Sequence, residues 1–156
     1  MTTNAQTPTK RYYEDVQVGD AIPPLVKPPI TPLQLVRYAG ASGDFNPLHT
    51  DPKVGEALGF GGIIAHGMLI MMLIMGFVGQ LLSDFIGPTA LRAFGVRFRG
   101  MTHLEDMITC TGTITEKYEA EGEGRIAGTV QAADQTGNVK VAGTFVATLP
   151  KRSEGQ

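Results

Sequence analysis

A long apolar segment near the middle of the chain limits the folds that this sequence can adopt. Residues 63–82 are almost entirely apolar, and a membrane-spanning helix needs about 20 such residues. The interruptions are three glycines and two polar side chains, namely Gly67, Gly76, Gly79, His66 and Gln80. No lysine or arginine closely flanks the segment, although orientation in a bilayer normally relies on such charges. We therefore interpret it as a buried core helix from Ala65 to about Leu82 and expect no membrane span.

The C-terminal half of the chain shows the two-residue alternation that is typical of β-strands. Four segments carry it, at residues 91–99, 107–118, 124–133 and 139–149, with a turn over residues 134–138. Their short connections predict an antiparallel meander. Residues 21–27 are predicted to add a short edge strand, because Pro23 and Pro24 have no amide proton to donate to a ladder.

Shorter helices are predicted before the apolar segment. Thr31, Pro32 and Gln34 supply a cap, a proline for the first helical position and a capping box. This helix is expected to stop near residues 40–43 and to bury one face, formed by Leu33, Val36 and Gly40. Residues 53–58 are expected to form one or two further helical turns.

One long apolar helix followed by a meander favours a single α+β domain in which an antiparallel sheet wraps around the helix. The domain is expected to span residues 11–150, with flexible ends at residues 1–10 and 151–156. A half-wrapped sheet leaves an edge strand, which proteins often pair with a second copy of the same strand. The sequence therefore predicts a homodimer with a continuous sheet.

Charge and cysteine content exclude several classes of protein. The formal net charge of -2 argues against a general nucleic-acid binder, which is usually basic. The single cysteine, Cys110, excludes an intrachain disulfide framework and favours a reducing, cytoplasmic location. Because Cys110 lies in a strand-like run, we interpret it as a small packed residue and not as a nucleophile. Residues 1–10 lack the apolar core of a secretory signal.

The segment Ser42-Gly43-Asp44-Phe45-Asn46-Pro47-Leu48-His49 places a carboxylate and an imidazole on one loop. Pro47 prevents regular helix, so a turn can bring the side chains of Asp44 and His49 to one point. A carboxylate and an imidazole that share one water form an acid–base pair near neutral pH. Asn46 can hold the loop by bonding to its own backbone. The residues alone leave an alternative open, in which Asp44 only forms the turn and His49 is an ordinary loop histidine.

Other chemistries have weaker signals. A metal site would use Asp44 with His49, His66 and His103, but no tight ligand spacing such as His-x-x-x-His occurs, and no metal is expected. Ser42 lacks the Gly-x-Ser-x-Gly elbow of a serine nucleophile.

Gly67 stands where the long helix is expected to begin. The first amides of a helix have no partner within it, and the helix dipole adds partial positive charge there. A glycine also lets a substrate oxygen approach the backbone closely. Gly67 is therefore a candidate oxyanion donor, unless it only allows tight packing at the helix start, and His66 is expected to support the adjoining loop.

Two sequence blocks together resemble one family. Residues 38–49, Tyr-Ala-Gly-Ala-Ser-Gly-Asp-Phe-Asn-Pro-Leu-His, resemble the hydratase motif of MaoC-like proteins, the (R)-specific enoyl-CoA hydratases and 3-hydroxyacyl-thioester dehydratases. Residues 64–69, Ile-Ala-His-Gly-Met-Leu, are similar to the second block of that family. Less specific similarity extends from about Tyr12 to Leu149. Two departures are Gly55, where members often carry alanine or serine, and residues 100–103, where relatives often have a proline-containing turn.

The resemblance implies a hot dog fold, a homodimer or dimer of dimers, and reversible hydration of trans-2-enoyl thioesters to (R)-3-hydroxyacyl thioesters. The acyl group would be carried on CoA or on the phosphopantetheine of an acyl carrier protein, and no metal or redox cofactor is implied. Asp44 and His49 would form the acid–base pair, with the Gly67 amide as the oxyanion donor. Ser42, Asn46 and His66 are expected to support the pair. The side chains expected to line an acyl pocket, unless they only pack in the core, are Phe60, Ile63, Met68, Met71, Met72 and Phe77. Arg97 and Arg99 are expected to contact the phosphates of the carrier, unless they are ordinary solvated strand residues. Two alternatives remain, a hot dog acyl thioesterase and a non-catalytic acyl-binding protein or partner subunit of a heterodimeric dehydratase.

Overall fold

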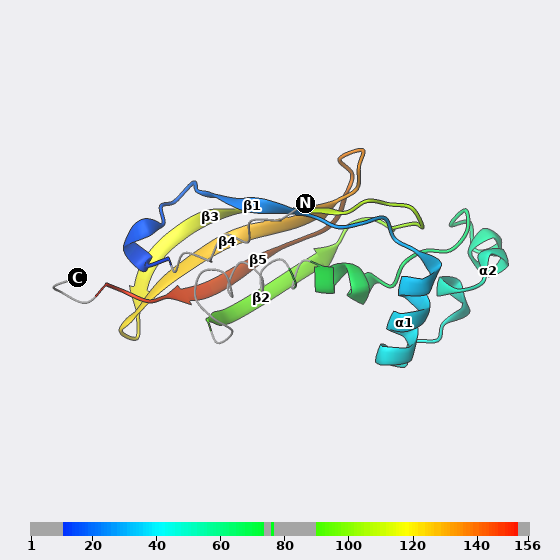
Figure 1. The fold of residues 1–156 in the computed structure, drawn as a ribbon, viewed down its shortest axis with the longest axis horizontal. Coiled ribbons are helices and arrows are strands. Elements are labelled where there is room, and N and C mark those ends of the chain that lie inside the picture. Colours follow the sequence, from blue (N-terminus) through cyan, green and yellow to red (C-terminus); the bar gives the residue numbers. More distant parts are fainter. Residues whose placement is uncertain (1–10, 74–75, 77–89, 153–156) are drawn as a thin grey trace, which may run out of the picture.

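A computed structural model describes residues 11–73, 76 and 90–152, and within them five strands form one antiparallel sheet. The strands are β1 (Ala21–Val26), β2 (Leu91–Phe98), β3 (Thr109–Ala120), β4 (Glu123–Ala133) and β5 (Val139–Leu149). Their order across the sheet is β1-β3-β4-β5-β2 (Figure 1). The expected flexible segment 1–10 lies outside the described residues.

The predicted meander is confirmed for β3, β4 and β5 but is wrong for β2. Strand β2 pairs with β5, placing Phe94 opposite Phe145, although β3 follows β2 in the chain. The edge of β3 that β2 would need is occupied by β1, which pairs Ile22 with Gly112. Strand β1 is an edge strand as predicted, and its register shifts between Ile22 and Leu25, where the two prolines stand.

Helix α1 (Pro32–Ser42) begins and ends where the sequence predicts. The Thr31 side chain accepts a hydrogen bond from the Gln34 amide, and Gly43 ends the helix in the left-handed conformation, with φ of 76°. The predicted buried face is wrong. Leu35 and Ala39 are buried, whereas the side chains of Leu33 and Val36 are 58% and 56% exposed, and Gly40 is exposed too. The helix therefore packs through the stripe next to the expected one.

The apolar segment forms a helix whose described part covers residues 67–73 and 76, and the rest of the predicted helix up to Leu82 lies outside the described residues. Leu69 and Ile70 join one core cluster with sheet residues such as Val130 and Phe145. The expected burial on all sides is wrong for the described part, because Met68 and Met72 are 50% and 52% exposed. Within the part of the chain that the structure covers, no helix combines the length and apolarity needed to cross a membrane.

Cys110 confirms its expected role as a packed residue, since it is fully buried. Burial raises the pKa of its thiol to about 11, so the thiol stays protonated near neutral pH.

Both short helices lie beyond one end of the sheet, near the start of the apolar helix (Figure 1). Helix α2 (Pro52–Ala57) is capped by Asp51, which accepts a hydrogen bond from the Lys53 amide. Gly55 on this helix is buried, and a β-carbon built on it would lie 1.8 Å from the carbonyl oxygen of Gly62. This contact explains why the chain carries glycine at Gly55, where the resembled family often has a larger residue.

Candidate active site

Polar side chains at the end of α1 shape the loop that carries Asp44. The Ser42 hydroxyl donates to the Tyr38 carbonyl at 2.8 Å and accepts from the Asp44 amide at 3.2 Å. The Asp44 carboxylate accepts from the Asn46 amide at 3.3 Å, and the Asn46 side chain accepts from the Leu48 amide at 3.1 Å. This bond from the Asn46 side chain to the backbone two residues further on is the local bond predicted from the sequence. The side-chain oxygens of Ser42 and Asn46 therefore form hydrogen bonds with backbone groups of α1 and this loop.

The structure brings the side chains of Asp44 and His49 together. A 3₁₀ turn, Pro47–His49, reverses the chain between them, so that His49 Nε2 lies 3.9 Å from Asp44 Oδ2. On its other side the ring is fixed, with Nδ1 2.7 Å from the Ile64 carbonyl oxygen. Because a carbonyl oxygen only accepts hydrogen bonds, Nδ1 carries the proton. His49 therefore presents Nε2 to the carboxylate.

The gap between these two atoms suits a bound water. A separation of 3.9 Å is too long for a direct hydrogen bond. A water oxygen placed about 2.8 Å from each atom bridges it. The side chain of Asp44 is 51% exposed while that of His49 is 11% exposed, so such a water can exchange with solvent from the Asp44 side.

His66 packs behind this pair and is 1% exposed. Its ring stacks on His49 with centroids 3.8 Å apart and an angle of 27° between the planes, and it tilts against Tyr38 with centroids 4.8 Å apart. Its Nε2 lies 3.1 Å from the main-chain carbonyl oxygen of Asp44. Burial lowers the pKa of His66, and the neighbouring His49 ring acts in the same direction.

Asp44, His49 and His66 are close enough to be considered as metal ligands, since one donor atom from each lies within 4.8 Å of the others. Two ring nitrogens, His49 Nδ1 and His66 Nε2, already bond to carbonyl oxygens. Each of the two rings therefore has one nitrogen left, His49 Nε2 and His66 Nδ1, that is not engaged with a carbonyl. His103 lies outside this cluster and bonds through Nε2 to the Phe60 carbonyl.

Gly67 is the first residue of the apolar helix and is exposed. The carbonyl of His66 accepts from the amides of Leu69 and Ile70, which starts the helical ladder. Among the described residues, no backbone carbonyl accepts from the amides of Gly67 or Met68. These two donors therefore remain available next to the Asp44–His49 loop.

The expected acyl-binding side chains flank the helix start but differ in exposure. Phe60, Ile63 and Met71 are partly buried, Met68 and Met72 are half exposed, and Phe77 lies outside the described residues. Ile63 also packs against the core cluster.

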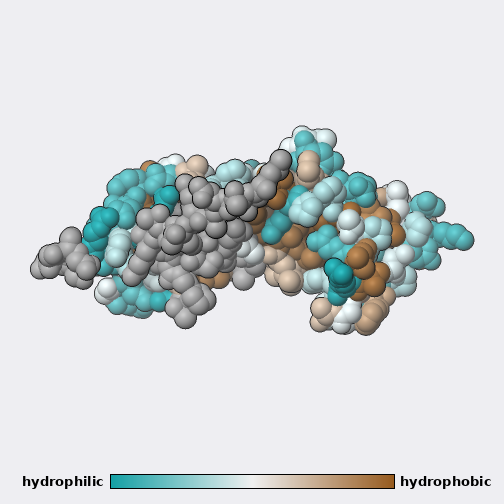
Figure 2. Space-filling model, in the orientation of Figure 1, coloured by the Kyte–Doolittle hydropathy of each residue, from teal (hydrophilic) through white to brown (hydrophobic). Residues whose placement is uncertain are grey.

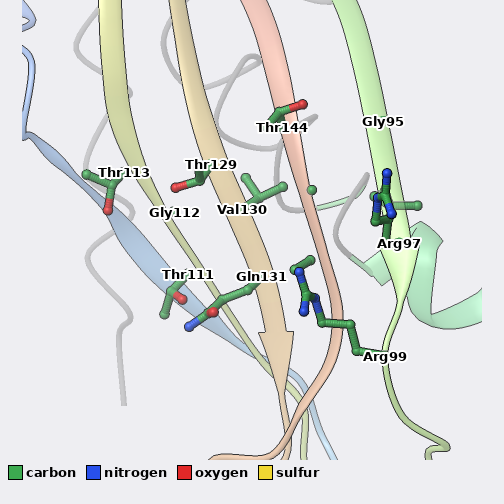
Figure 3. Close-up of a pocket in the computed structure, with 13 residues that line it drawn as sticks. Gly95, Arg97, Arg99, Thr111, Gly112, Thr113, Thr129, Val130, Gln131 and Thr144 are labelled. Carbon is green, nitrogen blue, oxygen red and sulfur yellow. The ribbon is translucent and has the colours of Figure 1, made fainter.

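Arg97 is not brought to this site. It projects from the same face of β2 as Arg99, opposite to Phe98, whose ring lies close to Gly67. Both arginines line a depression of about 700 Å³ together with threonines of β3, β4 and β5 (Figure 3). The expected contact of Arg97 and Arg99 with the phosphates of a carrier stays a prediction.

Sequence reasoning missed two supports of the pair. The Ile64 carbonyl that fixes His49 belongs to an isolated bridge between Ile64 and His103, and no sequence signal identifies it because main-chain groups are independent of residue type. The bond from His66 to the Asp44 carbonyl agrees with the support for this loop that the sequence predicts, whereas the stacking of His66 on His49 has no signal in the sequence.

Known proteins resemble the chain over most of its length. The sequence model of the MaoC like domain family matches residues 15–136. A 3-hydroxybutyryl-CoA dehydratase of Methylorubrum extorquens is 28% identical over 144 residues, covering 92% of this chain and 87% of the relative. An (R)-specific enoyl-CoA hydratase of Aeromonas caviae is 30% identical over 121 residues, covering 75% of this chain and 84% of the relative.

A solved structure also resembles the chain over most of its length. The (R)-hydratase from A. caviae superposes with a TM-score of 0.75 at 28% identity, covering 88% of this chain and 99% of that chain. This likeness confirms the expected hot dog fold.

Proposed function

The chain belongs to the MaoC-like domain family of hydratases and dehydratases, and from this we propose that it catalyses the reversible hydration of trans-2-enoyl thioesters to (R)-3-hydroxyacyl thioesters. The observation that carries the proposal is the 3.9 Å separation of Asp44 Oδ2 and His49 Nε2, with the opposite nitrogen of His49 bonded to a carbonyl. A carboxylate and an imidazole held in this way can bind one water between them.

The reaction adds a hydroxyl group to C3 and a proton to C2. Asp44 accepts a proton from the water as its oxygen bonds to C3, while His49 orients the water through Nε2. The pair then returns one proton to C2, so that a complete water molecule is added. Negative charge builds on the thioester oxygen during the attack, and the Gly67 amide donates a hydrogen bond to it.

We further infer that the chain acts as a homodimer on a thioester of CoA or of an acyl carrier protein. Apolar side chains are exposed on α1, on the apolar helix and at the end of edge strand β2, namely Leu33, Val36, Met68, Met72 and Phe98. Figure 2 shows apolar surface at the end of the molecule where α1 and α2 lie. A second copy that covers it would bury these side chains. Light scattering that gives a monomer at micromolar concentration would contradict the dimer.

The activity is tested with crotonyl-CoA, by following the loss of the conjugated enoyl absorbance and, separately, the release of free thiol. Hydration removes the absorbance without releasing thiol, whereas an acyl thioesterase releases thiol. Asp44→Asn and His49→Gln should each lower turnover at least about 100-fold. Glu56→Gln, which changes an exposed carboxylate on α2, is the matched control and should remain fully active. Wild-type turnover in Asp44→Asn or His49→Gln rules out the role assigned to that residue.

A further inference from the structure

We propose that His66 is a positioning residue, which fixes Asp44 and His49 relative to each other without transferring a proton itself. Its effect on turnover rests on the proposed function, whereas its effect on the state of His49 does not.

His66 contacts the two members of the pair in different ways. It donates from Nε2 to the Asp44 main-chain carbonyl at 3.1 Å, since a carbonyl oxygen only accepts. It covers one face of the His49 ring, with 3.8 Å between centroids. Tyr38 packs against the His66 ring in turn, 4.8 Å away between centroids. The buried side chain of His66 therefore restrains both the backbone of Asp44 and the plane of the His49 ring.

The surroundings of His66 keep it neutral. Nδ1 is buried and has no hydrogen-bond partner among the described residues, so a second proton there would be an unpaired buried donor. The titratable side chains around the ring are His49, Tyr38 and Asp44, and a charge on His66 would repel a charged His49. Burial also lowers the pKa of His66. Because the ring of His66 is neutral and its free nitrogen is shielded from solvent, it has no route for proton exchange. Its role is therefore to position Asp44 and His49.

That task matters because Asp44 has few other restraints. Its side chain is half exposed, and its other described hydrogen bonds, with Ser42 and Asn46, stay within the same loop. The bond from His66 is the contact that ties Asp44 to the start of the apolar helix. A misplacement of about 1 Å in a catalytic group can cost about 100-fold in rate. Loss of the His66 contacts should therefore reduce kcat more than substrate binding.

Two variants separate the contacts. His66→Gln retains an amide donor with about the reach of Nε2 but removes the ring, and His66→Phe retains a ring against His49 but removes the donor. We expect kcat to fall about 10- to 100-fold in His66→Phe, with KM within about threefold of the wild type. His66→Gln should recover a large part of that loss, because the Asp44 carbonyl keeps its donor.

Coupling to Asp44 provides the control for a general folding defect. If His66 acts through Asp44, His66→Phe should cause little further loss in the Asp44→Asn background. Equal losses in both backgrounds, a loss of kcat that only follows thermal stability, or a raised KM with unchanged kcat would each overturn the proposal.

A spectroscopic test does not depend on activity. Long-range ¹H–¹⁵N spectra of wild-type imidazoles should show His66 neutral with the proton on Nε2 and His49 with a proton on Nδ1. In His66→Phe the His49 resonances should shift, while those of His103, which bonds elsewhere, should not. A His66 that titrates as an ordinary exposed histidine overturns the proposal. If the chain hydrates no enoyl thioester but these spectra are as expected, the proposed function fails while the positioning role stands.

Discussion

Replacing Gly67 by proline tests the oxyanion donor with little disturbance of the fold. Proline lacks an amide proton, and it is well tolerated at the first position of a helix. The Gly67 amide donates to no backbone carbonyl among the described residues, so the substitution breaks none of the hydrogen bonds described there. The variant therefore removes a donor whose only proposed partner is the substrate.

Gly67→Ala is the matched control. A β-carbon at this position would lie 3.3 Å from Cε1 of Phe98, which requires the ring to move by a few tenths of an ångström. Alanine and proline both bring this β-carbon, but alanine keeps the amide proton. Their difference in activity reports the loss of the amide proton, provided that the imidazole spectra show His66, the residue before the proline, in the same state in both variants.

One oxyanion donor contributes about 3 kcal/mol to the transition state, which corresponds to about 100- to 1,000-fold in kcat. Gly67→Pro should therefore be slower than Gly67→Ala by about that factor in the crotonyl-CoA assay. Circular dichroism and thermal melting check that both variants fold alike. If Gly67→Pro is as active as Gly67→Ala, the Gly67 amide is not the donor and the reasoning from the helix start is refuted.

Three further predictions concern stability and reactivity. Gly55→Ala places a methyl group against a backbone carbonyl and should destabilise the fold by about 1–3 kcal/mol in urea unfolding; unchanged stability would contradict the contact. Cys110 should resist iodoacetamide at pH 8 in the folded chain and react once it is unfolded, because burial raises the pKa of its thiol to about 11; rapid alkylation of the native chain would contradict the burial. The Lys140 ammonium beside Asp134 lowers the pKa of that carboxyl below its unfolded value, so its stabilisation is complete above about pH 4 and is lost as the pH falls further. Asp134→Asn should therefore lower the melting temperature at pH 7 more than at pH 3, and equal losses at both values would show that the ion pair is not responsible.

Local features of the site could be predicted from the sequence because they depend on nearby residues. Pro47 forces a turn, Asn46 closes it, and the turn brings Asp44 and His49 together. The start of α1 was predictable for the same reason, since Thr31 caps an amide three residues away.

Which face of a helix is buried, and which strands are neighbours in the sheet, could not be predicted in this way. Apolar spacing in α1 allows two adjacent stripes, and the sequence does not say which one meets the core; the structure buries the stripe of Leu35 and Ala39. Strand alternation likewise predicts β2 without identifying its neighbour, which depends on β1 taking the free edge of β3. Gly55 could be recognised as unusual, but its cause is a carbonyl that approaches from a separate loop.

The geometry of the Asp44–His49 pair depends on contacts far from the motif that carries it. His49 is held by the Ile64 carbonyl, and Ile64 is bridged to His103 on the loop after β2. That loop is held by Asp106, which accepts from the His103 amide at 2.8 Å and lies 3.6 Å from the ammonium of Lys140 on β5. A chain of contacts thus runs from the sheet to the imidazole. Because these contacts join segments that are remote in sequence, a peptide of the motif alone would have the right residues without the fixed tautomer, and the pair requires the complete fold.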